Sequence, residues 1–403
     1  MMRIEYYISN LVYVLGNGIL KLLRLSLFGN SFPDNPQNIL ILRKGNLGDT
    51  ICAVPAMKAV KKRFPSSRFI FMTAEKTGNF PHTVEVLKGL IEFNEIFIYD
   101  PTALKNLRYF SKVVSQLRSK KLDLVVYLSQ SSNTFSWLLR DLLFFRIVGC
   151  KSACGFQWTK HWLFSLAQRR YRIFYREVDR LMKLVEPLGV SRKVSWDIPR
   201  VPLNFDLPKS LDSRPVIVIH PTAKFPVKRW PLERFLEVCR DLKKRCNPFF
   251  VVVGGSDAET NAEALVKTLK NDVLSLTGKT TFLQLAEVLR QCDLLVSCDS
   301  GPVHVAAAVG TPVVGIYSAR DYPQCWYPWG EQHIVLRKDP HCQARYKNEC
   351  ETMDCINDIT VDEVLKACDD ILKKNRKNKN DGFMTTSTVR DGKNPETIVF
   401  TET

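Results

Sequence analysis

The feature that most constrains this chain is an alternation of β-rich and helical segments that occurs in two blocks. In the first block, short apolar runs rich in β-branched residues predict strands at 39–43, 69–73, 96–99 and 122–128. Helical patterns lie between them, including those at 51–64 and 104–117. Strands that alternate with helices indicate a parallel sheet whose two faces are both covered.

The second block repeats this alternation after a proline-containing stretch with little periodicity. Strands are predicted at 216–220, 249–253, 273–276, 294–298 and 313–317, and helices at 232–245, 258–269, 282–291, 303–309 and 361–372. We therefore expect an α/β protein with Rossmann-like domains at 37–198 and 215–372, joined by a linker at 199–214. Two such sheets place a ligand cleft between the carboxyl ends of their strands.

The two ends of the chain extend beyond these blocks. The apolar run at 6–28 contains Lys21 and Arg24 and is interrupted by Gly16 and Gly18. A spanning helix needs about 20 apolar residues without internal charges, so this run is a poor span. Residues 1–36 therefore favour either an amphipathic helix in a membrane interface or a helix packed on the globular body. No cleavable signal peptide is expected, and the basic and polar residues 373–403 are predicted to be disordered.

Composition limits the partners and the compartment. The chain has 58 Lys and Arg against 41 Asp and Glu, a net charge of +17, which attracts phosphates in nucleic acid, anionic lipid or a charged substrate. Twelve scattered cysteines favour free thiols in a reducing compartment. No metal site is expected, although a structural zinc, a disulfide or free thiols all remain open for the widely spaced group His341, Cys342, Cys350 and Cys355.

A first candidate motif joins the first predicted strand to the next helix. It reads Arg-Lys-Gly-Asn-Leu-Gly-Asp-Thr-Ile at 43–51 and lacks the spacing of a dinucleotide fingerprint. Asp49 is expected near the helix N-terminus at the carboxyl edge of the sheet, where a carboxylate could accept a proton from a substrate hydroxyl. The alternative is that Asp49 only caps the helix.

A second candidate motif is the loop at 220–231, which follows the first strand of the second block. It contains Thr222 and the cations Lys224, Lys228 and Arg229, a group that suits a diphosphate. The alternative interpretation is a solvated basic loop.

A third motif, at 297–308, gives the strongest local signal. A buried strand ends in Asp299, and a helix rich in small residues follows Ser300 and Gly301 at once. The free N–H groups and dipole of that helix N-terminus favour an anion, and His304 in the first turn could reach a phosphate oxygen. The alternative is a plain strand–helix turn with Ser300 as its cap.

Taken together, these motifs resemble glycosyltransferase family 9, the bacterial heptosyltransferases of lipopolysaccharide core assembly. The matching residues are Gly48 and Asp49 with Pro55, then the run 228–231, the run 254–259, and the run 299–304. The resemblance covers residues 38–372. It implies a GT-B fold that binds the acceptor in the first domain and an ADP-sugar in the second, and that needs no cofactor.

The resemblance also implies the roles of individual residues. Asp49 would be the general base and Lys228 would neutralise the departing diphosphate, in a single displacement with inversion and without a metal. The donor site would comprise Thr222, Lys228, Glu259, Ser300, Gly301 and His304. The sugar would be heptose, on the evidence of the family's other members.

Three classes of function follow from these observations. The first is a glycosyltransferase on the inner face of the cytoplasmic membrane, acting on a lipopolysaccharide-core or related lipid-linked saccharide. In this class the basic stretch at 160–193, with Arg169, Arg170, Arg172, Arg176 and Arg180, would meet anionic lipid or an acidic acceptor. The alternatives are a non-catalytic sugar-nucleotide-binding or membrane-scaffold protein, or a transferase for another nucleotide sugar. The third class, a nucleic-acid-binding protein, is suggested only by the charge. No nucleic-acid partner is expected, because the chain lacks a basic motif of recognised type.

Overall fold

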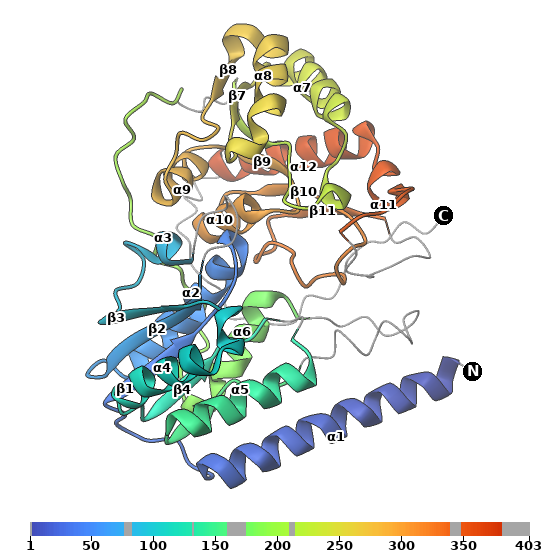
Figure 1. Cartoon of the computed structure of the whole chain (residues 1–403). Coiled ribbons are helices and arrows are strands. Elements are labelled where there is room, and N and C mark those ends of the chain that lie inside the picture. The colour runs from blue at the N-terminus through green and yellow to red at the C-terminus, as the bar shows by residue number, and fades with distance from the viewer. Residues whose placement is uncertain are drawn as a thin grey trace.

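The chain folds into two lobes, each built around one parallel sheet (Figure 1). The structure, a computed structural model, describes residues 2–75, 83–130, 133–158, 175–208, 214–338 and 348–380. The first sheet has the strand order β3-β2-β1-β4-β5 and the second has the order β11-β10-β9-β6-β7-β8. Helices cover both faces of each sheet, as the alternating pattern predicts.

The first sheet is built around β1 (Asn38–Leu42), in which Ile39 pairs in parallel register with Phe69 and Leu124. The other strands are β2 (Arg68–Ala74), β3 (Glu95–Tyr99), β4 (Leu124–Tyr127) and β5 (Ser152–Cys154). The helices of this half are α2 (Leu47–Arg63), α3 (Thr83–Leu87), α4 (Leu107–Arg118), α5 (Phe135–Val148) and α6 (Glu177–Val185). Helix α4 begins later than predicted because the side chain of Asn106 accepts hydrogen bonds from the backbone of Arg108 and Tyr109 and caps it there.

The second sheet contains β6 (Val216–His220), β7 (Phe249–Val252), β8 (Val273–Ser275), β9 (Leu294–Cys298), β10 (Val313–Tyr317) and β11 (Ile334–Arg337). Its helices are α7 (Leu232–Cys246), α8 (Glu259–Leu269), α9 (Phe282–Arg290), α10 (Gly301–Val309), α11 (Asp354–Asn357) and α12 (Val361–Asn380). Helix α12 differs from the expectation, since it continues past residue 372 into the segment predicted to be disordered. Lysine and arginine have good helix propensity, and the Asn375 side chain donates a hydrogen bond to the Asp293 carbonyl.

The two faces of the first sheet belong to different cores. Ile39 and Ile41 face a core that continues through α2, α6, α9 and α10 to the second sheet. Leu40 and Leu42 face an outer core that includes residues of α1, α4 and α5. The two lobes are therefore joined by a shared core, and residues of α1, α4 and α5 pack on the face of the first sheet that is turned away from that core.

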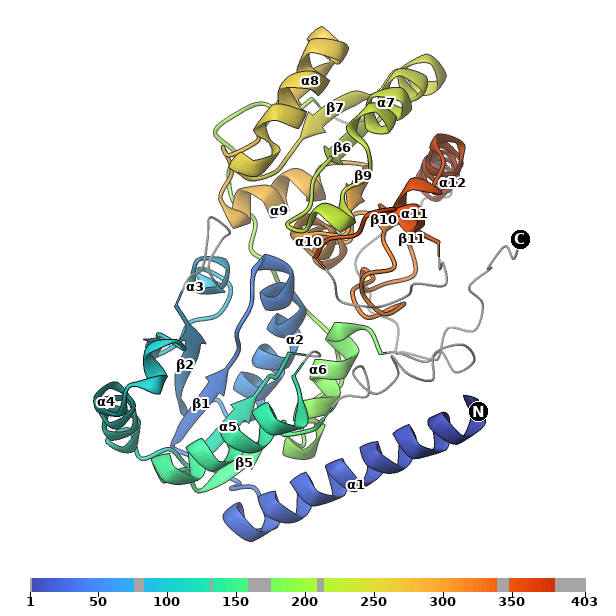
Figure 2. The same ribbon diagram turned by 45° about the vertical axis from the view of Figure 1, so that its right-hand side comes forward.

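Helix α1 (Met2–Phe28) lies alongside α5 at the bottom of both views (Figures 1 and 2). Leu20 is fully buried in the outer core. The Asn17 side chain accepts a hydrogen bond from the Trp158 backbone N–H at 2.9 Å and donates one to the Trp158 carbonyl at 3.1 Å. One side of α1 thus packs on the globular body, as one of the two interpretations of this segment holds.

Candidate active site

The first and third motifs meet where α2 and α10 pack against each other across the two lobes. A Cβ atom added at Gly48 would lie 2.9 Å from Cδ2 of His304. A Cβ added at Gly301 would lie 2.7 Å from Cδ2 of Leu47. Both distances are shorter than side-chain contacts allow, so glycine at these two positions lets the first turns of the two helices approach each other.

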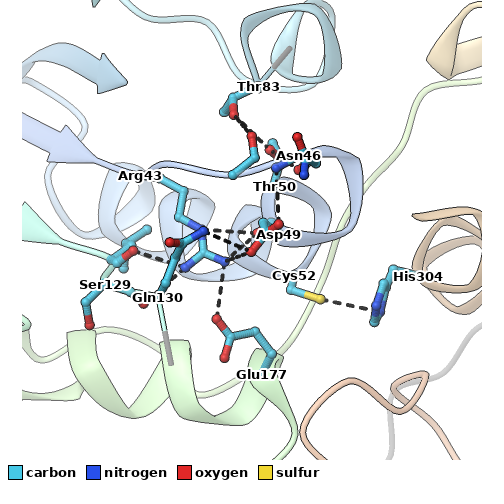
Figure 3. Close-up of polar contacts among 12 residues, drawn as sticks. Arg43, Asn46, Asp49, Thr50, Cys52, Thr83, Ser129, Gln130, Glu177 and His304 are labelled. Carbon is cyan, nitrogen blue, oxygen red and sulfur yellow. Dashed lines mark hydrogen bonds and ion pairs between the residues drawn. The ribbon is translucent and has the colours of Figure 1, made fainter. Parts of the chain in front are cut away.

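Asp49 lies in the first turn of α2 at this junction (Figure 3). Its Oδ2 accepts a hydrogen bond from the Asn46 backbone N–H at 3.1 Å, so it does cap the helix. Its Oδ1 lies 3.4 Å from Nε2 of Gln130, and the side chain keeps 20% of its surface exposed. One carboxylate oxygen therefore holds the helix start, while the other lies beside Gln130 and 3.6 Å from Nη2 of Arg43, in a side chain that stays partly exposed.

A buried arginine fixes the backbone at Asp49. Nε and Nη2 of Arg43 donate to the Asp49 carbonyl at 3.2 and 2.9 Å, and Nη1 donates to the Leu128 and Ser129 carbonyls, both at 3.1 Å. Arg43 is fully buried, and Oε1 of Glu177 lies 3.2 Å from its Nη2. Because a buried charge is expensive without a partner, this ion pair stabilises the guanidinium in the position that holds the α2 turn.

The same carboxylate joins a second arginine to this cluster. Oε2 and Oε1 of Glu177 each accept a hydrogen bond from Arg180 at 2.7 Å, through Nε and Nη2. The sequence predicted that Arg180 belongs to an exposed basic stretch, but Arg180 is buried and is not part of such a surface. Arg176 donates to the Gly330 carbonyl of the second lobe at 3.0 Å, whereas Arg169, Arg170 and Arg172 lie outside the described residues.

Lys228 lies at the end of a short 3-10 turn, Pro226–Lys228, and points inward. Its Nζ lies 2.6 Å from Oδ2 of Asp299 and 2.5 Å from Oδ2 of Asp321. Burial by itself lowers the pKa of Lys228, but the two carboxylates outweigh burial and raise that pKa above the ordinary lysine value. The buried ammonium therefore stays charged, whereas Lys224 and Arg229 of the same loop are exposed, as the alternative of a solvated basic loop holds.

His304 stands in the first turn of α10 with its ring at the junction (Figure 3). Its Nδ1 lies 3.4 Å from Sγ of Cys52 in α2. Burial lowers the pKa of His304 and raises the pKa of the Cys52 thiol, so both groups are uncharged near neutral pH. Ser300 occupies the cap position of α10, but its side chain accepts no hydrogen bond from the first turn of that helix, and its hydroxyl donates to the Cys298 carbonyl at 3.1 Å. The N–H groups of this helix start therefore lack that side-chain acceptor.

The remaining predicted donor residues lie along the same edge of the second sheet. Thr222 is buried in the loop after β6. Glu259 is exposed at the first residue of α8, which follows β7, the neighbour of β6. The Asn261 side chain donates to the Pro221 carbonyl at 2.9 Å and ties α8 to the loop that carries Thr222.

Comparison with known proteins now gives the family. The sequence profile described as glycosyltransferase family 9 (heptosyltransferase) matches residues 110–356, more than half of the chain. The chain belongs to glycosyltransferase family 9. It is a glycosyltransferase with a GT-B fold, as the resemblance of its motifs to this family implied.

Individual relatives of this family 9 chain are distant in sequence. Lipopolysaccharide heptosyltransferase 3 of Escherichia coli is 24% identical over 348 residues, which cover 81% of this chain and 96% of the relative. A family 9 structure from Veillonella parvula DSM 2008 has a TM-score of 0.63 and 22% identity, and covers 86% of this chain and 100% of its own. E. coli heptosyltransferase WaaC, solved with ADP-2-deoxy-2-fluoro heptose, has a TM-score of 0.54 and 16% identity, with 83% and 99% covered.

Sequence reasoning missed several residues of the site of this transferase. Asp321 was given no role, although it follows predicted strand 313–317 at the carboxyl edge, where polar residues signal a site. Burial raises the pKa of Asp321, but the charges of Lys228 and Arg320 outweigh burial and lower it. Arg43 was quoted only as the start of a motif, and no local pattern pairs it with Glu177.

Metal binding was not expected from the sequence. Within the described residues, no group of three or more His, Cys, Asp or Glu side chains is arranged to hold an ion. His341 and Cys342 lie outside the described residues, whereas Cys350 is exposed and Cys355 is half-buried. The alternatives for this group of four therefore stay open.

Proposed function

We propose that this chain transfers heptose from ADP-heptose to a hydroxyl of a lipopolysaccharide-core saccharide, with inversion at the anomeric carbon and at the cytoplasmic face of the membrane. The observation that carries the proposal is the close packing of the first turn of α2, which carries Asp49, against the first turn of α10, which comes from the other lobe. The names of the family 9 relatives support heptose as the sugar and lipopolysaccharide as the acceptor. The ADP-heptose analogue bound by a relative of the same fold supports the donor.

In this proposal, Asp49 accepts the proton of the acceptor hydroxyl as that oxygen attacks the anomeric carbon. The bond from the anomeric carbon to the diphosphate oxygen breaks on the opposite side, which inverts the configuration. Arg43 holds the carbonyl of Asp49, so the carboxylate is positioned before the acceptor arrives. Such a general base contributes about 10²–10⁴-fold to the rate.

The departing diphosphate would settle against the first turn of α10, where Ser300 and Gly301 provide backbone N–H groups and the helix dipole favours an anion. His304 is neutral, and a thiol proton donated by Cys52 to Nδ1 would leave Nε2 protonated to donate to a phosphate oxygen. Lys228 supplies the positive charge nearby. Asp299 and Asp321 would accept hydrogen bonds from sugar hydroxyls, while Thr222 and Glu259 would contact the nucleoside.

The test is the variant Asp49→Asn. The asparagine side chain retains an oxygen that can accept from the Asn46 N–H, so the helix cap and the fold should survive. We expect kcat to fall by about 10²–10⁴-fold, because the base is lost, while the Kd for ADP-heptose measured by calorimetry changes little. Asp100→Asn, which removes an exposed carboxylate after β3 on the same sheet, is the matched control and should leave kcat unchanged.

Two results would overturn parts of this proposal. An unchanged kcat in folded Asp49→Asn, or an equal loss of donor affinity, would remove Asp49 as the base. Tighter binding of a UDP- or GDP-linked sugar than of ADP-heptose in the same calorimeter would redirect the donor assignment without touching the base.

A further inference from the structure

Helix α1 is apolar on two opposite sides. The buried side includes Gly16, Leu20 and Phe28, which face the outer core. The opposite side carries large apolar side chains that are 41–67% exposed, namely Leu11, Val12, Val14, Leu15, Ile19 and Leu22. A surface helix in water normally presents polar residues on its outer side, and a contiguous exposed apolar stripe marks an interaction site. We call these six residues the outer stripe.

The surroundings of the outer stripe are cationic. Helices α1, α4 and α5 together form the outer layer, and their exposed charged side chains are Lys21, Arg108, Lys112, Arg118, Arg140 and Arg146. Residues 11–28, 107–118 and 135–148 together contain one carboxylate, that of Asp141. It is buried and accepts hydrogen bonds from the Tyr127 hydroxyl and from Arg140, both at 2.6 Å. The outer layer thus offers an apolar stripe beside positive charge with no exposed negative charge among these residues.

Helix α5, which lies beside α1, adds exposed apolar residues of its own (Figure 2). Trp137, Leu143 and Ile147 are 52, 43 and 46% exposed, and Leu143 and Ile147 lie one helical turn apart. The Arg140 guanidinium lies 5.9 Å from the centre of the Trp137 ring. Tryptophan and arginine side chains of this kind suit the boundary between lipid headgroups and acyl chains, where one part of the side chain is apolar and the other is hydrated.

We propose that α1 lies in the plane of an anionic bilayer, with the outer stripe among the acyl chains and the cations of α4 and α5 on the headgroups. The run Leu11–Phe28 is long and apolar enough to cross a membrane by length and composition alone. A span does not fit its position, because Leu20 is buried in the body and Asn17 is hydrogen-bonded to Trp158. A second copy of the chain docked on the outer stripe does not fit either, because the cations of the two copies would then face each other.

This docking orients the whole enzyme. The outer layer would rest on the bilayer, and the second lobe, which lies across the first sheet and its inner helices, would point away from it (Figure 1). Gln130 lies in the connection from β4 to α5 and donates a hydrogen bond to Asp49, so Trp137 and Arg140 stand on the outer-layer helix that follows this connection directly. The inference does not depend on which sugar is transferred.

The experiment measures binding of the full chain to vesicles by co-sedimentation. Vesicles of phosphatidylcholine are compared with vesicles that also contain phosphatidylglycerol. The test variant carries Leu11→Gln, Leu15→Gln and Leu22→Gln. The matched control carries Ile96→Gln, Ile98→Gln and Val266→Gln, which are exposed apolar residues on β3 and α8. A charge variant carries Lys112→Gln, Arg140→Gln and Arg146→Gln. Thermal unfolding checks that every variant is folded.

We expect the parent chain and the matched control to sediment with phosphatidylglycerol vesicles, and the outer-stripe variant to bind more than about tenfold less. The charge variant should lose binding mainly to anionic vesicles, and this loss should resemble the effect of added salt. Binding by the outer-stripe variant at the parent level, or equal loss in the matched control, would overturn the proposal. Resistance of the bound chain to alkaline carbonate extraction would also overturn the proposal, because such resistance indicates a span. So would a parent chain that binds no vesicles but forms a dimer that the outer-stripe substitutions dissociate.

Discussion

The charge balance around Lys228 shows how a single residue couples stability to the chemistry of the site. Its ammonium is buried between the carboxylates of Asp299 and Asp321, and Arg320 compensates Asp321 from the other side at 2.8 Å. Removing one member of a buried charge group is far more costly than breaking an exposed pair, because the remaining charges cannot regain their hydration. A residue assigned to a leaving group by resemblance is thus also a structural residue.

Replacing Lys228 by methionine should lower the free energy of unfolding by about 3–5 kcal/mol, because it leaves Asp299 and Asp321 buried without their shared cation. Urea denaturation measures the loss. The matched variant Arg245→Met breaks the more exposed pair with Asp369 and should cost less than about 1 kcal/mol. Equal losses in the two variants would show that Lys228 is solvated.

The same group predicts the pH dependence. The folded-state pKa of Asp321 is lowered, so its contribution is present above the unfolded pKa of about 3.9 and is lost as the pH falls through the folded value. The folded-state pKa of Lys228 is raised, so its contribution is present below about pH 10.4 and is lost at higher pH. Unfolding free energy should therefore fall less steeply on acidification in Asp321→Asn than in the parent chain.

At the scale of one element, α2 contains a proline that its surroundings accommodate. Pro55 has no N–H to donate to the carbonyl of Ile51, four residues earlier. The indole N–H of Trp196 donates to that carbonyl at 2.8 Å. Trp196 also packs edge-to-face on Trp329 of the second lobe, with ring centres 5.4 Å apart. The segment after α6 thus provides a hydrogen-bond donor for the Ile51 carbonyl, which has no donor at position 55 of the helix.

Trp196→Phe should lower the free energy of unfolding by about 1–3 kcal/mol, because the buried Ile51 carbonyl loses its donor. Adding Pro55→Ala supplies a backbone N–H within the helix and should recover part of that loss. A double-mutant cycle by urea denaturation measures the coupling. Strictly additive effects would show that the indole N–H and Pro55 are not linked through this carbonyl.

At the scale of the whole molecule, the proposed catalysis depends on how closely the two lobes approach. The core shared by α2, α6, α9 and α10 holds the lobes together, and the contacts at Gly48 and Gly301 set the separation of Asp49 from α10. A change of about 1 Å in such a separation can reduce a rate by about 10²-fold.

Gly48→Ala should displace His304 or separate the lobes, because its new Cβ would lie 2.9 Å from the imidazole. We expect kcat to fall by up to about 10²-fold with a lower Tm. Gly18→Ala is the matched control, because a Cβ at Gly18 meets nothing within 4 Å. If both variants behave alike in transfer assays and thermal unfolding, the close approach of α2 and α10 has no catalytic consequence.

Local sequence patterns were sufficient for most of the elements and for the main motifs. Strands such as β1 and β9 are short apolar runs in which nearly every residue is buried. A run of consecutive apolar residues is therefore enough to predict them. The turn after β9 could be predicted as a candidate anion site because the atoms of a helix N-terminus belong to consecutive residues. The strands β5 and β11 were missed, since one is only three residues long and the other is half-buried at the sheet edge.

The sequence by itself determined the alternation of strands and helices, the family motifs and the excess of positive charge, because each is a property of neighbouring residues or of a sum. Tertiary structure decided which distant groups meet: Arg43 with Glu177, Lys228 with Asp321, and Gly48 with His304. It also decided which side of α1 is covered. These outcomes depend on packing between segments far apart in the chain, which no local periodicity encodes.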